Sequence, residues 1–156
     1  FNEKSCGGRL KVVFVPMETS VYCDDRQEAH KLSRLAAGRF DYAVMTEELS
    51  VEERCSAIAR CGLFVGMRFH SLVFALSSAV PSIAMYHGEY YERKVTGLFE
   101  AYDMLRYRLS MDDMEGLGPL LSALYKERAG IKTELRRKHS DILRLQDKVY
   151  SSLFSL

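Results

Sequence analysis

Short apolar runs alternate with longer amphipathic segments along most of this chain, and that alternation limits its possible folds more than any other feature. Candidate strands are rich in Val, Ile and Phe and lie at residues 10–15, 42–46, 63–66 and 81–86, with a shorter one at 105–110. Helical spacing of apolar residues follows each of the first four runs. Strands and helices in alternation predict a parallel sheet with helices on both faces, an α/β fold of Rossmann-like type.

Local signals place three of the helix ends. Asp24 and Asp25 suit the N-terminus of a helix, and Gly38 suits its C-cap. Ser50 followed by Glu53 three residues later is a capping-box pattern, and it predicts a helix start at this position. The order of the strands within the sheet stays open.

The C-terminal part of the chain predicts a long amphipathic helix over residues 131–153. Its apolar stripe runs through Leu135, Ile142, Val149 and Leu153, and Lys and Arg outnumber Asp and Glu along it. This excess of positive charge indicates a solvated face or, as the alternative, contact with anionic lipid at the inner face of a membrane. The stripe also predicts some self-association. Gly116, Gly118 and Pro119 predict an interruption in the preceding helix.

We therefore expect residues 1–9 to be a linker from a preceding N-terminal half, 10–130 to be a Rossmann-like domain and 131–156 to be the C-terminal helix.

A net charge of +1 argues against a nucleic-acid partner. The four cysteines form no CxxC pair, which favours free thiols in a reducing cytoplasm and indicates no metal site. The chain lacks GxGxxG, GxxxxGK[ST], HExxH and GxSxG motifs, which counts against dinucleotide, ATP, metalloprotease and serine-hydrolase functions.

Ligands of open α/β sheets bind at the carboxyl ends of the strands, which directs attention to the loops at 16–26, 46–50, 66–71 and 86–94. One of these loops contains the sequence GMRFH. Gly66 ends a strand, a helix begins near His70 or Ser71, and the free N–H groups of a helix start favour anions. Arg68 adds a guanidinium that matches carboxylate or phosphate, and His70 can donate a proton or a hydrogen bond. Two structural alternatives stay open: Arg68 could pair with an acidic residue of a neighbouring loop, and His70 could cap its helix.

The segments that surround the GMRFH loop follow one another in an order that is typical of a known family. After the strand and GMRFH come a small, apolar helix, the pair Val80–Pro81, a further strand ending at Tyr86, and then Lys94 with Val95. This succession resembles the polysaccharide pyruvyl transferase family over roughly residues 10–105.

The resemblance implies a transferase of the two-domain GT-B type, of which this chain would be the C-terminal half, inactive without the other half. It implies phosphoenolpyruvate as co-substrate, with no other cofactor, and a glycan or lipid-linked sugar as acceptor. The pyruvyl group would be transferred as a cyclic ketal to two hydroxyls of a bacterial cell-surface glycan, with release of phosphate. Arg68 and His70 would be the catalytic residues that contact phosphoenolpyruvate.

Further residues are substrate-binding candidates beside this pair. Arg68 and the helix start at Ser71 would hold one anionic group, and Lys94 would hold the other, with Arg93 as its competitor. The family's short Y-D-P-K-V spacing is stretched here, which leaves the choice between Lys94 and Arg93 open. Tyr86 at the strand end would line the cleft or only pack, and Glu18 would accept hydrogen bonds from sugar hydroxyls. His70 would act as an acid or as an anion clamp.

Two other functions stay open. The same architecture could bind a nucleotide sugar as half of a GT-B glycosyltransferase. A degenerate family member could instead serve as a non-catalytic scaffold, although the intact Arg68 and His70 argue against this.

Overall fold

The computed structural model describes residues 11–35 and 40–154, and it contains two parallel sheets flanked by helices. The expected linker at 1–9 and the predicted cap at Gly38 lie outside these residues. In the first sheet, β1 (Lys11–Phe14) pairs with β4 (Asp41–Val44). In the second sheet, β6 (Ser82–Tyr86) lies between β5 (Phe64–Gly66) and β7 (Arg108–Ser110). All five strands fall where the sequence predicts them.

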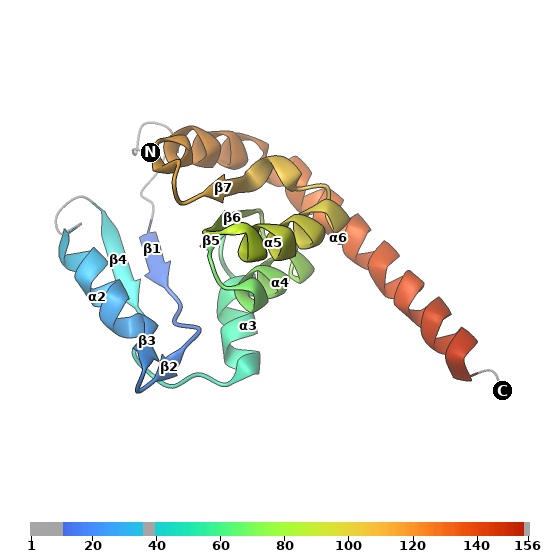
Figure 1. The fold of residues 1–156 in the computed structure, drawn as a ribbon, viewed down its shortest axis with the longest axis horizontal. Helices are drawn as coiled ribbons and strands as arrows, with labels where there is room; N and C mark the ends of the chain where they lie inside the picture. The colour runs from blue at the N-terminus through green and yellow to red at the C-terminus, as the bar shows by residue number, and fades with distance from the viewer. Residues whose placement is uncertain (1–10, 36–39, 155–156) are drawn as a thin grey trace.

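The prediction of one continuous sheet is wrong for the described residues, because β1 and β5 are not hydrogen-bonded to each other. β4 and α2 (Asp25–Leu35) lie outermost, β1 lies inside them, and the β5–β6–β7 sheet lies beyond β1 (Figure 1). Side chains make the contact between the two sheets: Val15 and Met17, just after β1, pack against a buried cluster that contains Ile58 and Val80. Val12 and Val13 on β1 stay exposed, as expected for a strand that no second sheet covers.

The helices that follow the strands have identifiable starts. α3 (Val51–Ala59) begins with the predicted capping box: Ser50 Oγ accepts from the Glu53 amide at 3.2 Å, and Glu53 Oε2 accepts from the Ser50 amide at 2.8 Å. α4 (Phe69–Ser77) begins one residue earlier than expected, with Arg68 as its N-cap. α5 (Glu89–Ala101) follows β6 and contacts both β6 and β7.

The core lies around the second sheet. Ser82, Ile83 and Ala84 are all fully buried on β6, and because successive side chains of a strand point to opposite faces, both faces of this strand are covered. Leu72 and Leu76 of α4 and Phe99 of α5 contribute to the same cluster. The buried core therefore lies around the sheet that contains β5, the strand from which the GMRFH loop leaves.

The C-terminal helix α6 runs unbroken over Leu117–Phe154, so it begins well before the predicted residue 131. Of the predicted interruption, only the part at Gly116 is confirmed, because a short 3₁₀ turn at Met114–Gly116 precedes α6. Pro119 lies in the first turn, where the missing N–H has no helical partner to lose. Leu124 and Leu135 are buried in the core, whereas the last turns project away from the body of the protein and expose Leu145, Val149 and Leu153 (Figure 1). The expected self-association of this stripe stays a prediction. None of the helices in residues 11–35 and 40–154 has the length and apolar character needed to cross a bilayer.

Candidate functional site

The loops after β1 and β5 meet where the two sheets approach each other. From β1 the chain turns through α2 to β4 on one side, while β5, β6 and β7 follow on the other side (Figure 1). Open α/β folds bind their ligands at the carboxyl ends of parallel strands, and both of these loops leave such strand ends. The loop after β1 also holds a small antiparallel hairpin, β2 (Thr19–Ser20) with β3 (Cys23–Asp24), inside the segment that the sequence predicts as a loop.

Arg68 and Asp25 form the polar contact that joins these loops. Arg68 Nη2 donates to Asp25 Oδ1 at 2.8 Å, and Arg68 Nε donates to Asp25 Oδ2 at 3.2 Å. Arg68 Nη2 also lies 3.2 Å from Cys23 Sγ. The sequence left open that Arg68 pairs with an acidic residue of a neighbouring loop, and this pairing is confirmed. The side chain of Arg68 nevertheless remains 43% exposed, so the ion pair leaves part of the guanidinium accessible.

Asp25 is the centre of the loop after β1. Its Oδ2 accepts from the backbone amides of Met17 at 3.1 Å and Glu18 at 3.0 Å, in addition to Arg68. Partial burial opposes ionisation of this carboxyl, but the hydrogen bonds from Arg68 and from the two amides outweigh burial and lower the pKa of Asp25. The same carboxylate raises the pKa of Arg68. Both groups are therefore charged at neutral pH.

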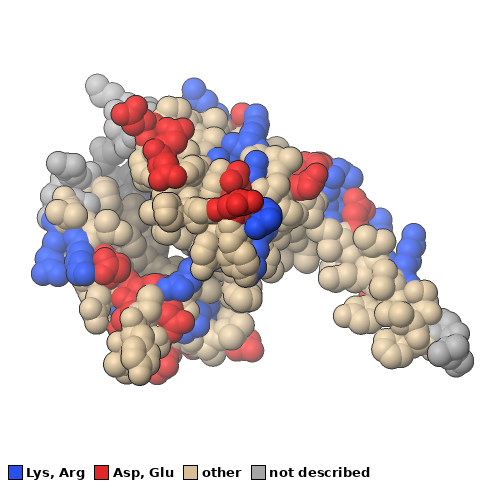
Figure 2. Space-filling view, viewed as in Figure 1, with Lys and Arg blue, Asp and Glu red and all other residues tan. Residues whose placement is uncertain are grey.

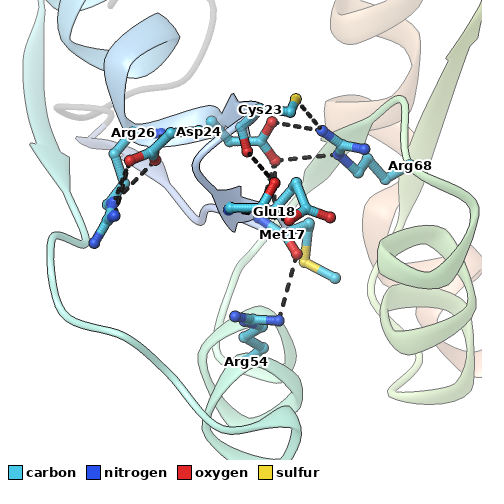
Figure 3. Close-up of polar contacts among 9 residues, drawn as sticks. Met17, Glu18, Cys23, Asp24, Arg26, Arg54 and Arg68 are labelled. Carbon is cyan, nitrogen blue, oxygen red and sulfur yellow. Dashed lines mark hydrogen bonds and ion pairs between the residues drawn. The ribbon is translucent and has the colours of Figure 1, made fainter.

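Two further arginines tie the surrounding loops together (Figure 3). Arg54 of α3 donates from Nη1 to the Met17 carbonyl at 3.4 Å, and its buried Nε has no partner among the described residues. Arg26 forms an ion pair with Asp24 at 2.8 Å and donates to the Thr46 carbonyl at 3.1 Å. The loops after β1, β4 and β5 therefore converge at one edge. Figure 2 shows acidic and basic side chains side by side there, so the surface is not uniformly basic.

His70 is exposed in the first turn of α4. Its ring meets the ring of Phe69 edge to face, with centroids 6.0 Å apart, and it has no hydrogen-bond or ion-pair partner among the described residues. The alternative that His70 caps its helix is wrong, because Arg68 occupies the N-cap position. The imidazole is therefore free to meet a ligand at the helix start.

Ser71 does not face an open site. It is only 2% exposed, and its hydroxyl donates to the Arg68 carbonyl at 2.7 Å inside the first turn of α4. The expected direct contact of Ser71 with substrate is therefore corrected to a role in holding the backbone of Arg68. Gly66 lies against the same hydroxyl and against the ring of Phe64, which leaves no room for a side chain at this position.

Lys94 lies near the start of α4, whereas the side chain of Arg93 is directed along its own helix, α5. The Lys94 ammonium is 4.7 Å from the ring centroid of Tyr90 and 5.8 Å from that of Phe69, the residue between Arg68 and His70. Arg93 instead extends along its own helix to Glu89, with 3.6 Å between Arg93 Nη1 and Glu89 Oε1. Of the two cations that the sequence left open, Lys94 is the one beside the GMRFH loop.

The remaining candidates lie at the rim. Tyr86 donates to Glu92 Oε1 at 3.5 Å and is half-buried, so its hydroxyl is engaged within the second sheet and α5. Glu18 accepts from the Ser20 amide at 3.1 Å and is half-buried beside Asp25. The sequence reasoning missed Asp25 and Arg54 as members of this region. The pair Asp24–Asp25 gave a signal, but it was interpreted only as a helix N-terminus.

Comparison with known proteins adds one decisive match. The family model of polysaccharide pyruvyl transferases matches residues 6–89, more than half of the chain. The chain belongs to the polysaccharide pyruvyl transferase family. The match includes GMRFH and Asp25, whereas Lys94 lies beyond its end. No curated protein and no solved structure matches the chain significantly.

Membership of this family indicates a transferase of pyruvyl groups that serves polysaccharide synthesis. The described residues contain no cluster of His, Cys, Asp or Glu that could hold a metal ion. What they do bring to the helix start are two cations and an imidazole, a set suited to binding a small anion.

Proposed function

We propose that this chain binds phosphoenolpyruvate at the start of α4 and takes part in transferring its pyruvyl group, as a ketal, to sugar hydroxyls of a cell-surface glycan. The observation that carries the proposal is the exposure of Arg68 and His70 at one helix N-terminus, in the family's own motif, with Lys94 close to the residue between them. The rest of a GT-B cleft, including the acceptor site, would come from a preceding half of the protein.

The ligand and the residues are chemically matched. Phosphoenolpyruvate carries a carboxylate and a phosphate on one small frame, and a guanidinium and an ammonium can each take one of these groups. The first N–H groups of α4 add partial positive charge at the same place. Arg68 holds one anionic group and Lys94 the other.

The reaction requires proton transfer. The methylene carbon of phosphoenolpyruvate gains a proton and becomes a methyl group, while two sugar hydroxyls form C–O bonds to the adjacent carbon and the bond to the phosphate oxygen breaks. Of the two hydroxyl protons, one balances the new methyl proton and the other leaves with phosphate. His70, exposed and free of partners among the described residues, serves as the acid for the methylene or as a further donor to the anion.

A thermal-shift comparison tests this function against the nucleotide-sugar alternative. Phosphoenolpyruvate at millimolar concentration should raise the melting temperature of the chain, because a ligand that binds only the folded state stabilises it. UDP-glucose should not raise it. Stabilisation by UDP-glucose alone would favour a glycosyltransferase, and stabilisation by neither ligand would favour a non-catalytic member of the family.

A further inference from the structure

We propose that Asp25 is a positioning residue for Arg68: its carboxylate holds one edge of the guanidinium so that the opposite end faces the incoming anion. This inference rests on the proposed binding of phosphoenolpyruvate at Arg68. It assigns a role in the site to a residue from the loop after β1, on the other sheet.

The geometry of the guanidinium supports this division of its donors. The Nε and Nη2 atoms of Arg68 both donate to Asp25, and Nη2 also reaches Cys23 Sγ at 3.2 Å. Nη1 has no partner among residues 11–35 and 40–154. A guanidinium is planar and offers donors along more than one edge, so a carboxylate on the Nε–Nη2 edge leaves the Nη1 end open to a second anion.

Asp25 is itself held in place, which a positioning residue requires. Its Oδ2 accepts from the amides of Met17 and Glu18, and its own amide donates to the Glu18 carbonyl at 2.9 Å. It is also the first residue of α2, where a negative charge is favourable. Two backbone amides therefore hold the carboxylate, and a third backbone hydrogen bond holds the main chain of Asp25.

The contact also links two sheets that share no backbone hydrogen bond within the described part of the chain. Asp25 belongs to the first sheet's loop and helix, and Arg68 leaves the end of β5 in the second sheet. A flexible arginine would lose rotamer freedom when it binds an anion, whereas an arginine already held by Asp25 loses less. The carboxylate also repels an approaching anion. We infer that the gain from positioning exceeds this repulsion, because the pair is partly exposed and solvent weakens the repulsion.

A substitution at Asp25 can remove its ion pair with Arg68 while keeping its hydrogen bonds to the backbone amides. Asp25→Asn keeps an oxygen that can accept from the Met17 and Glu18 amides, but it replaces the anionic fork toward Arg68. We expect the dissociation constant for phosphoenolpyruvate, measured by titration calorimetry, to rise about five- to tenfold. Asp24→Asn is the matched control, since Asp24 binds Arg26 rather than Arg68, and it should change the constant by less than about twofold.

A double-mutant cycle shows whether Asp25 acts through Arg68. Asp25→Asn combined with Arg68→Lys should bind no more weakly than Arg68→Lys alone, because the lysine has already lost the fork that Asp25 positions. Arg68→Lys leaves Asp25 and its backbone contacts intact but cannot form the fork, so it should weaken binding about as much as Asp25→Asn. Additive losses in the cycle, or unchanged or tighter binding by Asp25→Asn, would overturn the inference.

A ligand-free measurement separates failure of this inference from failure of the proposed function. The Nε–H proton of Arg68 should be protected from solvent exchange in NMR spectra of the unmodified chain and of Asp24→Asn, and protection should be lost in Asp25→Asn. If the unmodified chain binds no phosphoenolpyruvate, the proposed function fails, and this spectrum still decides whether Asp25 anchors Arg68. Protection retained in Asp25→Asn would refute the anchoring.

Discussion

The ammonium of Lys94 lies 5.8 Å from the ring centroid of Phe69, so a cation of α5 reaches the residue that separates Arg68 from His70. The same ammonium lies over Tyr90, one turn earlier on α5. Aromatic faces hold a cation without neutralising it, so Lys94 keeps its charge available to a ligand. This relationship favours Lys94 over Arg93 as the cation beside the GMRFH loop.

The first prediction concerns Lys94 and Arg93. Lys94→Gln should weaken the binding of phosphoenolpyruvate about fivefold, because one cation facing the anion is lost. Arg93→Gln, one residue earlier, should leave the affinity within about twofold, since Arg93 is engaged with Glu89 along the helix. Titration calorimetry on both variants measures the difference. Equal effects of the two substitutions would remove Lys94 from the site.

Gly66 gives a prediction about packing beneath the site. A Cβ at Gly66 would lie 2.4 Å from Cε1 of Phe64 and 3.1 Å from Oγ of Ser71, so Gly66→Ala forces the ring to move. We expect a loss of about 1–3 kcal/mol in the free energy of unfolding, measured with urea. Gly97→Ala is the control, because open space surrounds that position within α5, and it should stabilise by about 0.5–1 kcal/mol. An unchanged free energy of unfolding in Gly66→Ala would show that this position has room for a side chain.

The long helix α6 gives a prediction about where the core ends. Leu135 is 0% exposed and Leu145 is 63% exposed on the same helix. Leu135→Ala should lower the free energy of unfolding by about 2–5 kcal/mol, and Leu145→Ala should change it by less than about 0.5 kcal/mol. Urea titration of the two variants checks this at a concentration where the chain is monomeric. A large effect of Leu145→Ala would show that the projecting turns have a partner.

The Asp25–Arg68 pair should make stability depend on pH. Because the folded state lowers the pKa of Asp25, the ionised carboxylate contributes stability above its unfolded pKa, and this contribution is lost as pH falls through the folded pKa. The difference in unfolding free energy between the unmodified chain and Asp25→Asn should therefore be constant near neutral pH. It should shrink as the pH falls below about 4. A difference that grows on acidification would contradict the assigned direction.

Much of this arrangement could be predicted from local sequence. The strand–helix alternation and the capping box at Ser50 depend on residues close together in the chain, and both are confirmed. The position of GMRFH at a strand end and helix start follows from the same kind of signal. The resemblance to the pyruvyl transferases is also confirmed, since the family model matches more than half of the chain.

The features that could not be predicted depend on distant pairing. The partner of Arg68 lies 43 residues earlier in the chain, and nothing in the spacing distinguishes Asp25 from Asp24 as that partner. The split into two sheets reflects which strand edges meet, and strand order is not encoded in local periodicity. The sequence places the start of the C-terminal helix too late because Pro119 disfavours a helix interior, whereas in the structure it lies in the first turn of α6, where its cost is small.

An NMR titration with phosphoenolpyruvate tests most directly whether Arg68 and His70 together bind a small dianion. We predict that the ligand shifts the backbone resonances of residues 66–71, and that both Arg68→Ala and His70→Ala abolish these shifts. Arg137→Ala should preserve them, because Arg137 is an exposed, ion-paired arginine on α6 away from the GMRFH loop. Shifts that persist in Arg68→Ala, or a spectrum of the unmodified chain that does not change at millimolar ligand, would contradict the claim.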